Sequence, residues 1–179
     1  MDTKSAFFIE HTERLLQSFT HWTGRDLLIP AGSSSRLAEQ LFHAPFVVVS
    51  HGVEDDPLLD YGNETALALW EMSWETFTRT PSRLTAEPVS REERARLLAE
   101  VTRKGFIDNY KGIRISRTGR RFMIEQALVW NLLDKRKPPL WASGDILAME
   151  ILVRYNMKIG IKAGEPEFQF LNSTFLIRN

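Results

Sequence analysis

The chain has 179 residues, with 23 basic and 23 acidic side chains and no cysteine. This length is typical of one domain, or of one domain with a tail. The lack of cysteine excludes disulfides, Cys-ligated metals and any thiol-linked chromophore. A net charge of zero argues against attraction of the whole surface to nucleic acid or anionic membranes. No signal peptide or long apolar span is visible, so we expect a cytoplasmic protein that does not enter a membrane.

The N-terminal part predicts two helices. Residues 5–20 carry apolar side chains at helical spacing, and Gly24 is suited to end that helix. A second helix is expected to begin in the serine cluster at 33–35, and Pro45 breaks its pattern. We therefore expect an N-terminal helical cap over residues 1–42.

The next segment predicts one strand, a strand-like turn that would supply a second strand, and then short helices. Residues 46–50 (FVVVS) form a β-branched apolar run that is typical of a strand. Residues 52–62 are acidic and turn-rich, and Asn63 is suited to cap a helix. A short helix is expected over 73–78, before a loop with two prolines at 79–88. We expect these helices to cover one face of a sheet.

A helix and a long hairpin follow. Ser90 and Glu93 fit a capping box for a helix that runs to about Lys104. Residues 106–116 and 121–133 predict two strands joined by the turn RTGR. Residues 140–149 are expected to form the next antiparallel strand. This order predicts an α+β fold with helices packed on an antiparallel sheet.

Both faces of the second hairpin strand are apolar. We expect one face to carry Phe122, Ile124, Leu128, Trp130 and Leu132, and the other Met123, Ala127, Val129 and Leu133. A sheet that is apolar on both faces needs a cover on both. The central helices would cover one face, and the N-terminal helix or a partner chain the other.

Several short blocks, in order along residues 7–134, resemble the MEKHLA domain family. The blocks are VVVSHG (47–52), DYGN (60–63), PSR (81–83), AEP (86–88), GFIDNYKGIRIS (105–116), GRRF (119–122) and VWNLLD (129–134). The resemblance implies a PAS-like domain over residues 43–149, with a five-stranded antiparallel sheet, short helices on one face and an N-terminal helix. PAS-like domains usually act as sensory or interaction modules.

The C-terminal tail departs from the family pattern. The family continues after the hairpin with a Gly-Gln-Ala-Ala stretch, whereas this chain reads LWASGDILAMEIL from Leu140. Suitable codons for these residues, read one nucleotide later, encode Cys-Gly-Gln-Ala-Ala-Thr-Phe-Trp-Arg-Trp-Lys-Phe and a stop. One hypothesis is therefore that a frameshift produced residues 140–179. The other is a divergent extension. In either case, residues 150–179 are expected to form a tail outside the domain.

Eight side chains are candidates for ligand binding. His51 ends the first strand, where it could donate to a ligand, bind a haem iron, or satisfy nearby backbone groups. Arg83 could pair with a ligand carboxylate or phosphate, or with Asp55, Asp56 or Glu87. The aromatic candidates could line a pocket or fill the core. The full set is His51, Tyr61, Asn63, Trp70, Trp74, Arg83, Tyr110 and Asn131.

Other clusters favour structural roles. The acidic residues 54–60 lack the spacing of a calcium loop and predict a solvated turn. The basic residues of 101–121 could contact nucleic acid, but a charged strand edge that resists edge-to-edge pairing is the favoured interpretation. No metal motif and no nucleophile–base set is present in the sequence, so we assign no catalytic or metal-binding residue.

These observations favour a PAS-like sensory or protein-interaction module in a signalling or regulatory role. It would bind a small molecule or a protein partner, and the outer sheet face with the N-terminal helix would form a homodimer. The ligand would lie in a hollow between the sheet and the short helices. The alternative is a small redox protein or enzyme that binds flavin, haem or another cofactor in the same hollow. We expect no nucleic-acid partner.

Overall fold

In the computed structural model, the described residues are 5–29, 32–87, 96, 99–101, 103–133 and, for the backbone alone, 149–153. Both predicted N-terminal helices are confirmed, as α1 (Ala6–Thr23) and α2 (Ser34–Phe42). Gly24 ends α1 with a φ of 67°, a left-handed conformation that glycine adopts at no steric cost. Ser33 caps α2 by accepting a hydrogen bond from the Arg36 N–H.

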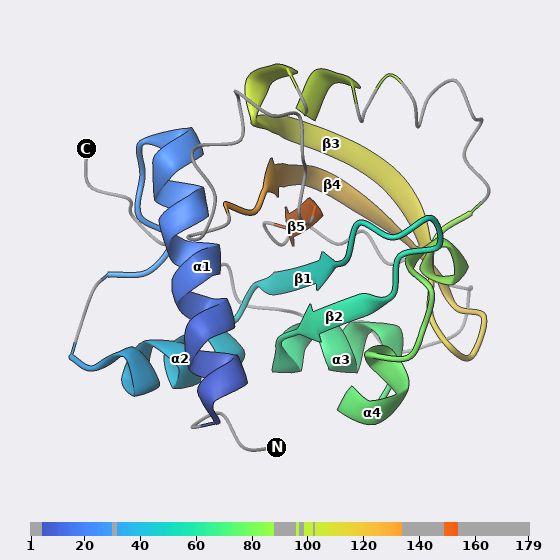
Figure 1. Ribbon diagram of the computed structural model, residues 1–179. Coiled ribbons are helices and arrows are strands. Elements are labelled where there is room, and N and C mark those ends of the chain that lie inside the picture. Colours follow the sequence, from blue (N-terminus) through green and yellow to red (C-terminus); the bar gives the residue numbers. More distant parts are fainter. Residues whose placement is uncertain are drawn as a thin grey trace.

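The strands are β1 (Val47–His51), β2 (Leu59–Gly62), β3 (Phe106–Ile115), β4 (Arg121–Asn131) and β5 (Met149–Val153). They form an antiparallel sheet in the order β2-β1-β5-β4-β3, so that β2 and β3 are its edges. The predicted α+β class and the hairpin of β3 and β4 are confirmed. The long curved pair β3–β4 is seen at the top of Figure 1.

β2 lies within the segment predicted as a strand-like turn, and it pairs with β1. One strand differs from the expectation. β5 begins at the last residue of the predicted strand 140–149 and continues to Val153, beyond the predicted domain boundary. The rest of that predicted strand, 140–148, lies outside the described residues.

Short helices connect the two halves of the sheet. They are α3 (Glu64–Trp70), α4 (Trp74–Phe77) and the 3-10 helix η1 (Ser82–Thr85), which occupies part of the predicted loop. Asn63 caps α3, as predicted, by accepting from the Ala66 N–H. Within the predicted helix that starts at Ser90, residues 96, 99–101 and 103–104 are helical, and the others lie outside the described residues.

A pair of β-bulges changes which residues of β4 share a face. Asn109 on β3 and Gln126 on β4 have φ angles of 63° and 55°, and the pairing register shifts on either side of Tyr110. Each bulge adds one residue to one strand, which reverses the alternation of side chains beyond it. The predicted grouping is therefore wrong, because Phe122 and Ile124 lie on the face opposite to Leu128, Trp130 and Leu132.

Each face of the sheet has its own core. On the face covered by α1 and α2, here called the outer face, Val48, Leu128 and Trp130 are buried against side chains such as Leu15 and Phe19. On the face covered by α3 and α4, the inner face, the buried residues are Val47, Val49, Leu59, Ala66, Leu69, Trp70, Phe77, Phe122, Ile124 and Ala127. The N-terminal helices thus provide the second cover that the apolar strand pattern predicts (Figure 1).

The length and hydropathy of the helices can be compared with those of a membrane span. Among the described residues, no helix combines the length and the apolar character needed to cross a membrane.

Candidate functional site

An open groove lies where the start of α1 meets the edge strand β2, the turn after β1, and α4. Its volume is about 600 Å³, within the range of small-molecule sites. The side chains that define its chemistry are three aromatic rings, two carboxylates and one leucine: Phe7, Phe8, Trp74, Glu54, Asp60 and Leu58.

The turn between β1 and β2 brings Glu54 to the groove. The Gly52 N–H donates to the Leu58 carbonyl at 3.1 Å and so closes the turn. The Glu54 carboxylate folds back over the glycine, where a Cβ at position 52 would lie 2.1 Å from its Oε2 atom. A larger residue at this position would therefore displace Glu54 from the groove.

A β-bulge places Asp60. Ser50 pairs with Tyr61, but His51 pairs with Leu59, so Asp60 is the extra residue of β2. Bulges of this kind redirect a side chain out of the regular alternation. The Ser50 hydroxyl donates a hydrogen bond to Asp60 Oδ1, and Asp60 is among the residues that line the groove.

Behind Asp60, a buried histidine completes a hydrogen-bonded chain. His11, on α1, lies with Nε2 2.9 Å from the Ser50 Oγ atom. Burial lowers the pKa of His11 from 6.5 to about 4, although the nearby Asp60 carboxylate raises it. The imidazole is therefore neutral at pH 7 and donates to Ser50, which in turn donates to Asp60.

Aromatic rings fix the orientation of this histidine. The His11 ring is stacked between Phe7, at a centroid distance of 5.4 Å, and Tyr61, at 5.2 Å. Phe8 lies 4.9 Å from Trp74 and 5.7 Å from Tyr61. The start of α1 is thus joined to β2 and α4 through one aromatic cluster, which also forms the wall of the groove.

The structure brings only some of the eight candidate residues together. Tyr61 and Trp74 meet with edge-to-face rings 5.9 Å apart, and Trp74 lines the groove. Trp70 is buried in the inner core against Phe122, and Tyr110 packs at the edge of that core. The four aromatic candidates therefore divide between the two faces of the sheet.

The polar candidates make local contacts. The Asn63 amide, besides capping α3, donates to the Phe46 carbonyl at 2.6 Å. Arg83 forms an ion pair with Asp56 at 2.9 Å, one of the structural partners that the sequence suggested. His51 has Nδ1 2.7 Å from the Gly52 carbonyl oxygen, so it contacts nearby backbone. Of these three residues, none lines the groove.

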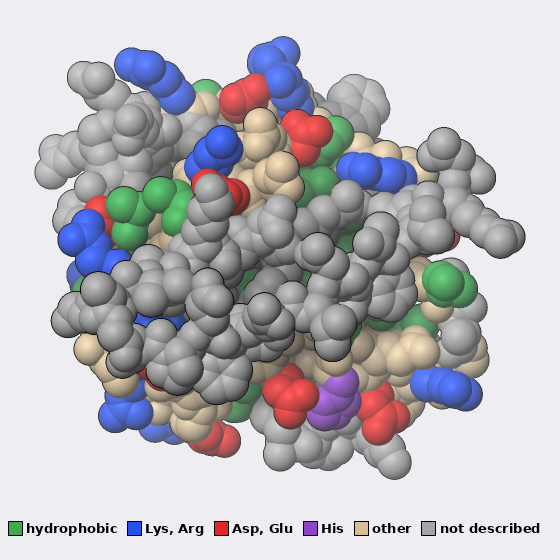
Figure 2. Space-filling model, turned by 180° about the vertical axis from the view of Figure 1, so that it is seen from behind, with side chains coloured by type: hydrophobic (Ala, Val, Ile, Leu, Met, Phe, Trp, Pro, Cys, Tyr) green, Lys and Arg blue, Asp and Glu red, His purple; other side chains and the backbone are tan. Residues whose placement is uncertain are grey.

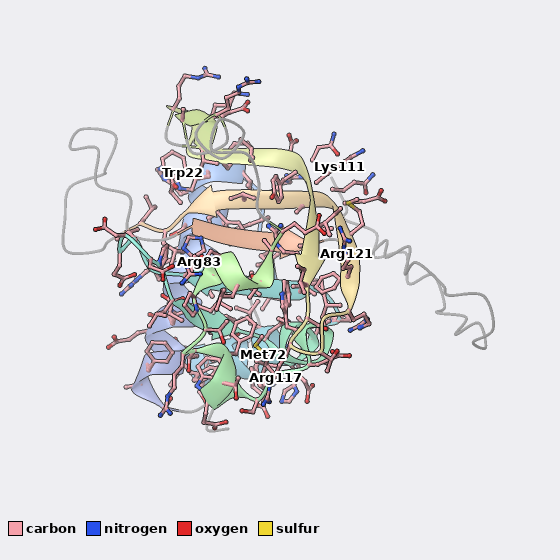
Figure 3. All side chains as sticks on the ribbon, turned by 90° about the vertical axis from the view of Figure 1, so that its right-hand side faces the viewer. Trp22, Met72, Arg83, Lys111, Arg117 and Arg121 are labelled. Carbon is pink, nitrogen blue, oxygen red and sulfur yellow. The ribbon has the colours of Figure 1, made fainter. Side chains whose placement is uncertain are left out.

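Asn131 joins three segments at the far end of β4. Its amide donates to the Val101 carbonyl at 3.2 Å, its N–H donates to the Gly105 carbonyl, and its carbonyl accepts from the Trp22 indole at 2.8 Å. Its side-chain Oδ1 atom is buried and has no hydrogen-bond partner among the described residues. Figure 3 shows Trp22 at the end of the β3–β4 pair opposite to Lys111.

Trp74 is the one groove residue among the eight candidates. The polar chain of the site consists of His11, Ser50 and Asp60, of which Asp60 alone was considered from the sequence, as part of the acidic turn 54–60. His11 lies on the buried stripe of α1, three residues after Phe8 and four before Leu15. That spacing was a usable signal for a buried histidine. Its contact with Ser50, 39 positions away, depends on how α1 packs across the sheet and has no local signature.

The basic segment of the hairpin is mostly engaged in local contacts. Arg114 is buried and lies over the Tyr110 ring, while Arg120 binds Glu71 and the Leu69 carbonyl. Arg121 pairs with Glu87. Figure 3 shows Arg121 and Lys111 on the β3–β4 side of the molecule, and Figure 2 shows acidic groups among the basic ones on the face it displays. Lys111 lies on the edge strand β3, where a charged edge was expected, whereas Arg120 lies in the turn and Arg121 on β4, which pairs on both sides.

Metal ligands are not gathered anywhere in the part of the chain that the structure describes. Within these residues, no three His, Asp or Glu side chains are grouped so that they could hold an ion. Glu54 and Asp60 share their groove with three aromatic rings and with the hydroxyl residues Ser5 and Thr78.

The MEKHLA domain model matches residues 9–140, well over half of the sequence. This chain belongs to the MEKHLA domain family. The match ends at Leu140, the residue from which the sequence departs from the family pattern. No curated protein sequence matches the chain.

Solved structures establish the fold of this MEKHLA domain. A PAS domain from Colwellia psychrerythraea is 14% identical, with a TM-score of 0.52, over 65% of this chain and 92% of that one. The PAS domain of an HTR-like protein from Haloarcula marismortui is 13% identical, with a TM-score of 0.51, over 68% and 89%. An RNA-binding light-oxygen-voltage receptor is 15% identical, with a TM-score of 0.51, over 70% of this chain and 36% of that one. The domain therefore has a PAS fold.

Proposed function

We propose that this MEKHLA domain is a sensory module in a signalling or regulatory role, and that its input is a small molecule bound in the groove between α1, β2 and α4. The observation that carries the proposal is the composition of the groove wall. It combines apolar rings with a few fixed polar groups, which is the pattern of a small-molecule site. The PAS fold is compatible with this function but does not specify the ligand.

The inner face offers less support for a ligand. Sequence reasoning expected a hollow under the short helices, but Trp70, Phe77 and Phe122 pack there in edge-to-face contact. The described residues of this core are closely packed around the sheet, with Phe77 and Ile124 almost completely buried. We therefore place the ligand in the groove, with Trp74 as its contact among the eight candidates.

The position of α1 suggests how binding would be transmitted. Phe7 and Phe8 form part of the groove, and the same helix holds Ser50 through His11 and covers the outer face with Leu15 and Phe19. A ligand that contacts Phe7 and Phe8 would change how strongly the first turns of α1 are held. Ligand binding would thus shift the population of docked α1.

A protein partner or a second copy of the chain would contact the outward side of α1. The outer face of the sheet itself is already covered, because α1 and α2 bury Val48 and Trp130 there. The sequence suggested a homodimer through the outer sheet face together with the N-terminal helix, and a contact made by the sheet itself would require α1 to leave. We propose the exposed side of α1, next to the half-exposed Phe7, as the interaction surface.

A rim substitution with a matched control tests the groove. Leu58 lines it and is 44% exposed, so Leu58→Trp should fill the groove without disturbing the core. Leu84, which is 56% exposed and does not line the groove, gives the control Leu84→Trp. We would screen small metabolites by melting temperature and then measure bound mass and subunit number by native mass spectrometry.

The expected result is a metabolite that raises the melting temperature of the wild type and of Leu84→Trp but not of Leu58→Trp. Amide hydrogen exchange in α1 should slow when this metabolite binds. A ligand that stabilises both tryptophan variants equally would show that the groove is not its site. An absorption band of flavin or haem in the purified protein would instead support the redox alternative.

A further inference from the structure

The groove differs from a general apolar pocket in its charge. Glu54 and Asp60 are both among its lining residues, and within the described part of the chain no lysine or arginine lines it. The Ser50 hydroxyl and, through it, His11 hold the Asp60 carboxylate in one orientation, with Oδ1 accepting from Ser50. The described lining of the groove therefore includes two carboxylates, one of which is held in place by a hydrogen bond.

The apolar walls are aromatic, and aromatic faces also attract cations. Phe8 and Trp74 lie 4.9 Å apart with their planes inclined by 39°, and Phe7, which is 49% exposed, lies at the mouth of the groove. The π face of a tryptophan or phenylalanine ring carries negative potential and binds ammonium groups, with tryptophan the strongest. The carboxylates and the rings thus favour the same charge.

We propose that the ligand of this groove is a small organic cation, an ammonium group on an apolar body. The ammonium group would contact the Asp60 carboxylate, and the apolar body would pack against Phe8, Trp74 and Leu58. This inference deepens the proposed function and rests on it, because it assigns a chemical class to the same site.

Two other classes of ligand fit the groove less well. An anion would face Glu54 and Asp60, and the residues that the structure describes place no lysine or arginine in the lining to balance them. A hard metal ion such as calcium needs six to eight oxygen ligands, whereas this site pairs two carboxylates with three aromatic rings. A volume of about 600 Å³ also exceeds what a single ion needs and matches a molecule of moderate size.

Calorimetric titration of the full chain with three probes of matched shape tests the charge preference. The probes are 2-phenylethylammonium, the neutral 2-phenylethanol and the anionic 3-phenylpropionate. We expect saturable binding of the ammonium compound, at least about tenfold tighter than that of the alcohol, and no binding of the carboxylate. A cation that binds no better than the alcohol would overturn the proposal.

Variants locate the charge that is responsible. Asp60→Asn should weaken binding of 2-phenylethylammonium by about tenfold or more, since it removes the charge-assisted contact. Glu54→Gln should weaken binding by a smaller factor. Glu39→Gln, on an exposed position of α2 outside the groove, should leave binding unchanged. Wild-type affinity in a folded Asp60→Asn protein would overturn the proposal.

A further pair of variants protects the test against misfolding of Asp60→Asn. Leu58→Lys puts a positive charge in the groove and should abolish binding of 2-phenylethylammonium, while Leu84→Lys should not. If the lysine at position 58 leaves binding of the cation intact, the inference is wrong.

The outcome also separates this inference from the proposed function. A bound neutral or anionic metabolite in native mass spectra, lost in Leu58→Trp, would support the sensory module and contradict the cationic ligand. Stabilisation by no metabolite and by none of the three probes would contradict both.

Discussion

The two faces of the sheet are built from the same strands but differ in polarity. On the inner face, Val47, Val49 and Phe122 pack against α3 and α4 in a core made of apolar side chains, and Trp70 there has no acceptor for its Nε1–H among the described residues. On the outer face, Ser50 and His11 form a buried polar chain that leads to Asp60 in the groove. The comparison indicates that the inner face contributes mainly stability, whereas the outer face holds the groups that could respond to a ligand.

Removal of a large core side chain should have the largest effect, on either face. Trp130, fully buried against Phe19 on the outer face, and Phe122, packed edge-to-face against Trp70 on the inner face, are the matched positions. Trp130→Ala and Phe122→Ala should each lower the free energy of unfolding by about 3–5 kcal/mol in urea denaturation. An unchanged melting temperature for Trp130→Ala would contradict its place in β4.

The pH dependence of stability should come largely from the outer face. Because the pKa of His11 is lowered from 6.5 to about 4 in the folded protein, the unfolded chain binds a proton there at higher pH than the folded one does. Stability should therefore fall as the pH drops from about 6.5 to 4, by roughly 3 kcal/mol for a shift of this size.

The variant His11→Phe isolates this contribution, since phenylalanine can still stack between Phe7 and Tyr61 but cannot be protonated. Urea midpoints measured at pH 7.5 and at pH 4.5 should differ less in His11→Phe than in the wild type. The exposed His21, also on α1, gives the control His21→Phe, which should keep the full pH dependence. If the difference between the two urea midpoints is the same in all three proteins, His11 is not the responsible group.

A smaller effect is expected where α3 meets the β3–β4 turn. Hydrogen bonds from Thr118 and Ser116, and then the charge of Arg120, hold the pKa of Glu71 below its ordinary value of 4.5. The contribution of Glu71 to stability is thus present above pH 4.5 and is lost as the pH falls through the lowered pKa. Glu71→Gln should speed hydrogen exchange in residues 116–120 at pH 7, with little change in the β1 amides. Unchanged exchange in the turn would argue against this anchor.

The smallest effect is expected at Arg83. Its ion pair with Asp56 joins two side chains that are each about half exposed, and such pairs contribute about 0–1 kcal/mol. A double-mutant cycle of Arg83→Ala and Asp56→Ala should give a coupling energy in that range, and ligand binding should not change. A loss of ligand binding in Arg83→Ala would show that Arg83 contributes to the binding site.

Local signals in the sequence were sufficient to predict most of the helices and strands. The caps at Ser33 and Asn63, the stop at Gly24 and the hairpin turn are each set by a few neighbouring residues. The bulges at Asn109 and Gln126 were not predictable in this way, because they depend on the register of two long strands. For the same reason the alternation of side chains along β4 was assigned incorrectly beyond the bulge.

The site was less accessible to sequence reasoning than the fold. Trp74 was selected because aromatic residues suit pockets, and it does line the groove. The polar part requires α1 to place His11 on Ser50 and a bulge to turn Asp60 outward, so no short motif contains it. Arg83 and Asn131, which were also selected, contact other segments of the fold and are not among the residues that line the groove.

The origin of the tail stays a prediction that the gene can decide. The second reading frame requires a codon ending in G for Leu140, GCA for Ala142 and AGC for Ser143. A frameshift predicts this codon set, whereas a serine codon of the TCN type at position 143 would contradict it. The strand β5 would then be formed by residues read from the altered frame.

The most direct test of the account uses one tryptophan from each face. In ¹H–¹⁵N spectra assigned with Trp70→Phe and Trp74→Phe, 2-phenylethylammonium should shift the indole signal of Trp74, in the groove, and leave that of Trp70, in the inner core, unchanged. A shift of Trp70 with Trp74 unchanged would place the ligand between the short helices and the sheet, and would contradict the assignment of the groove as the binding site.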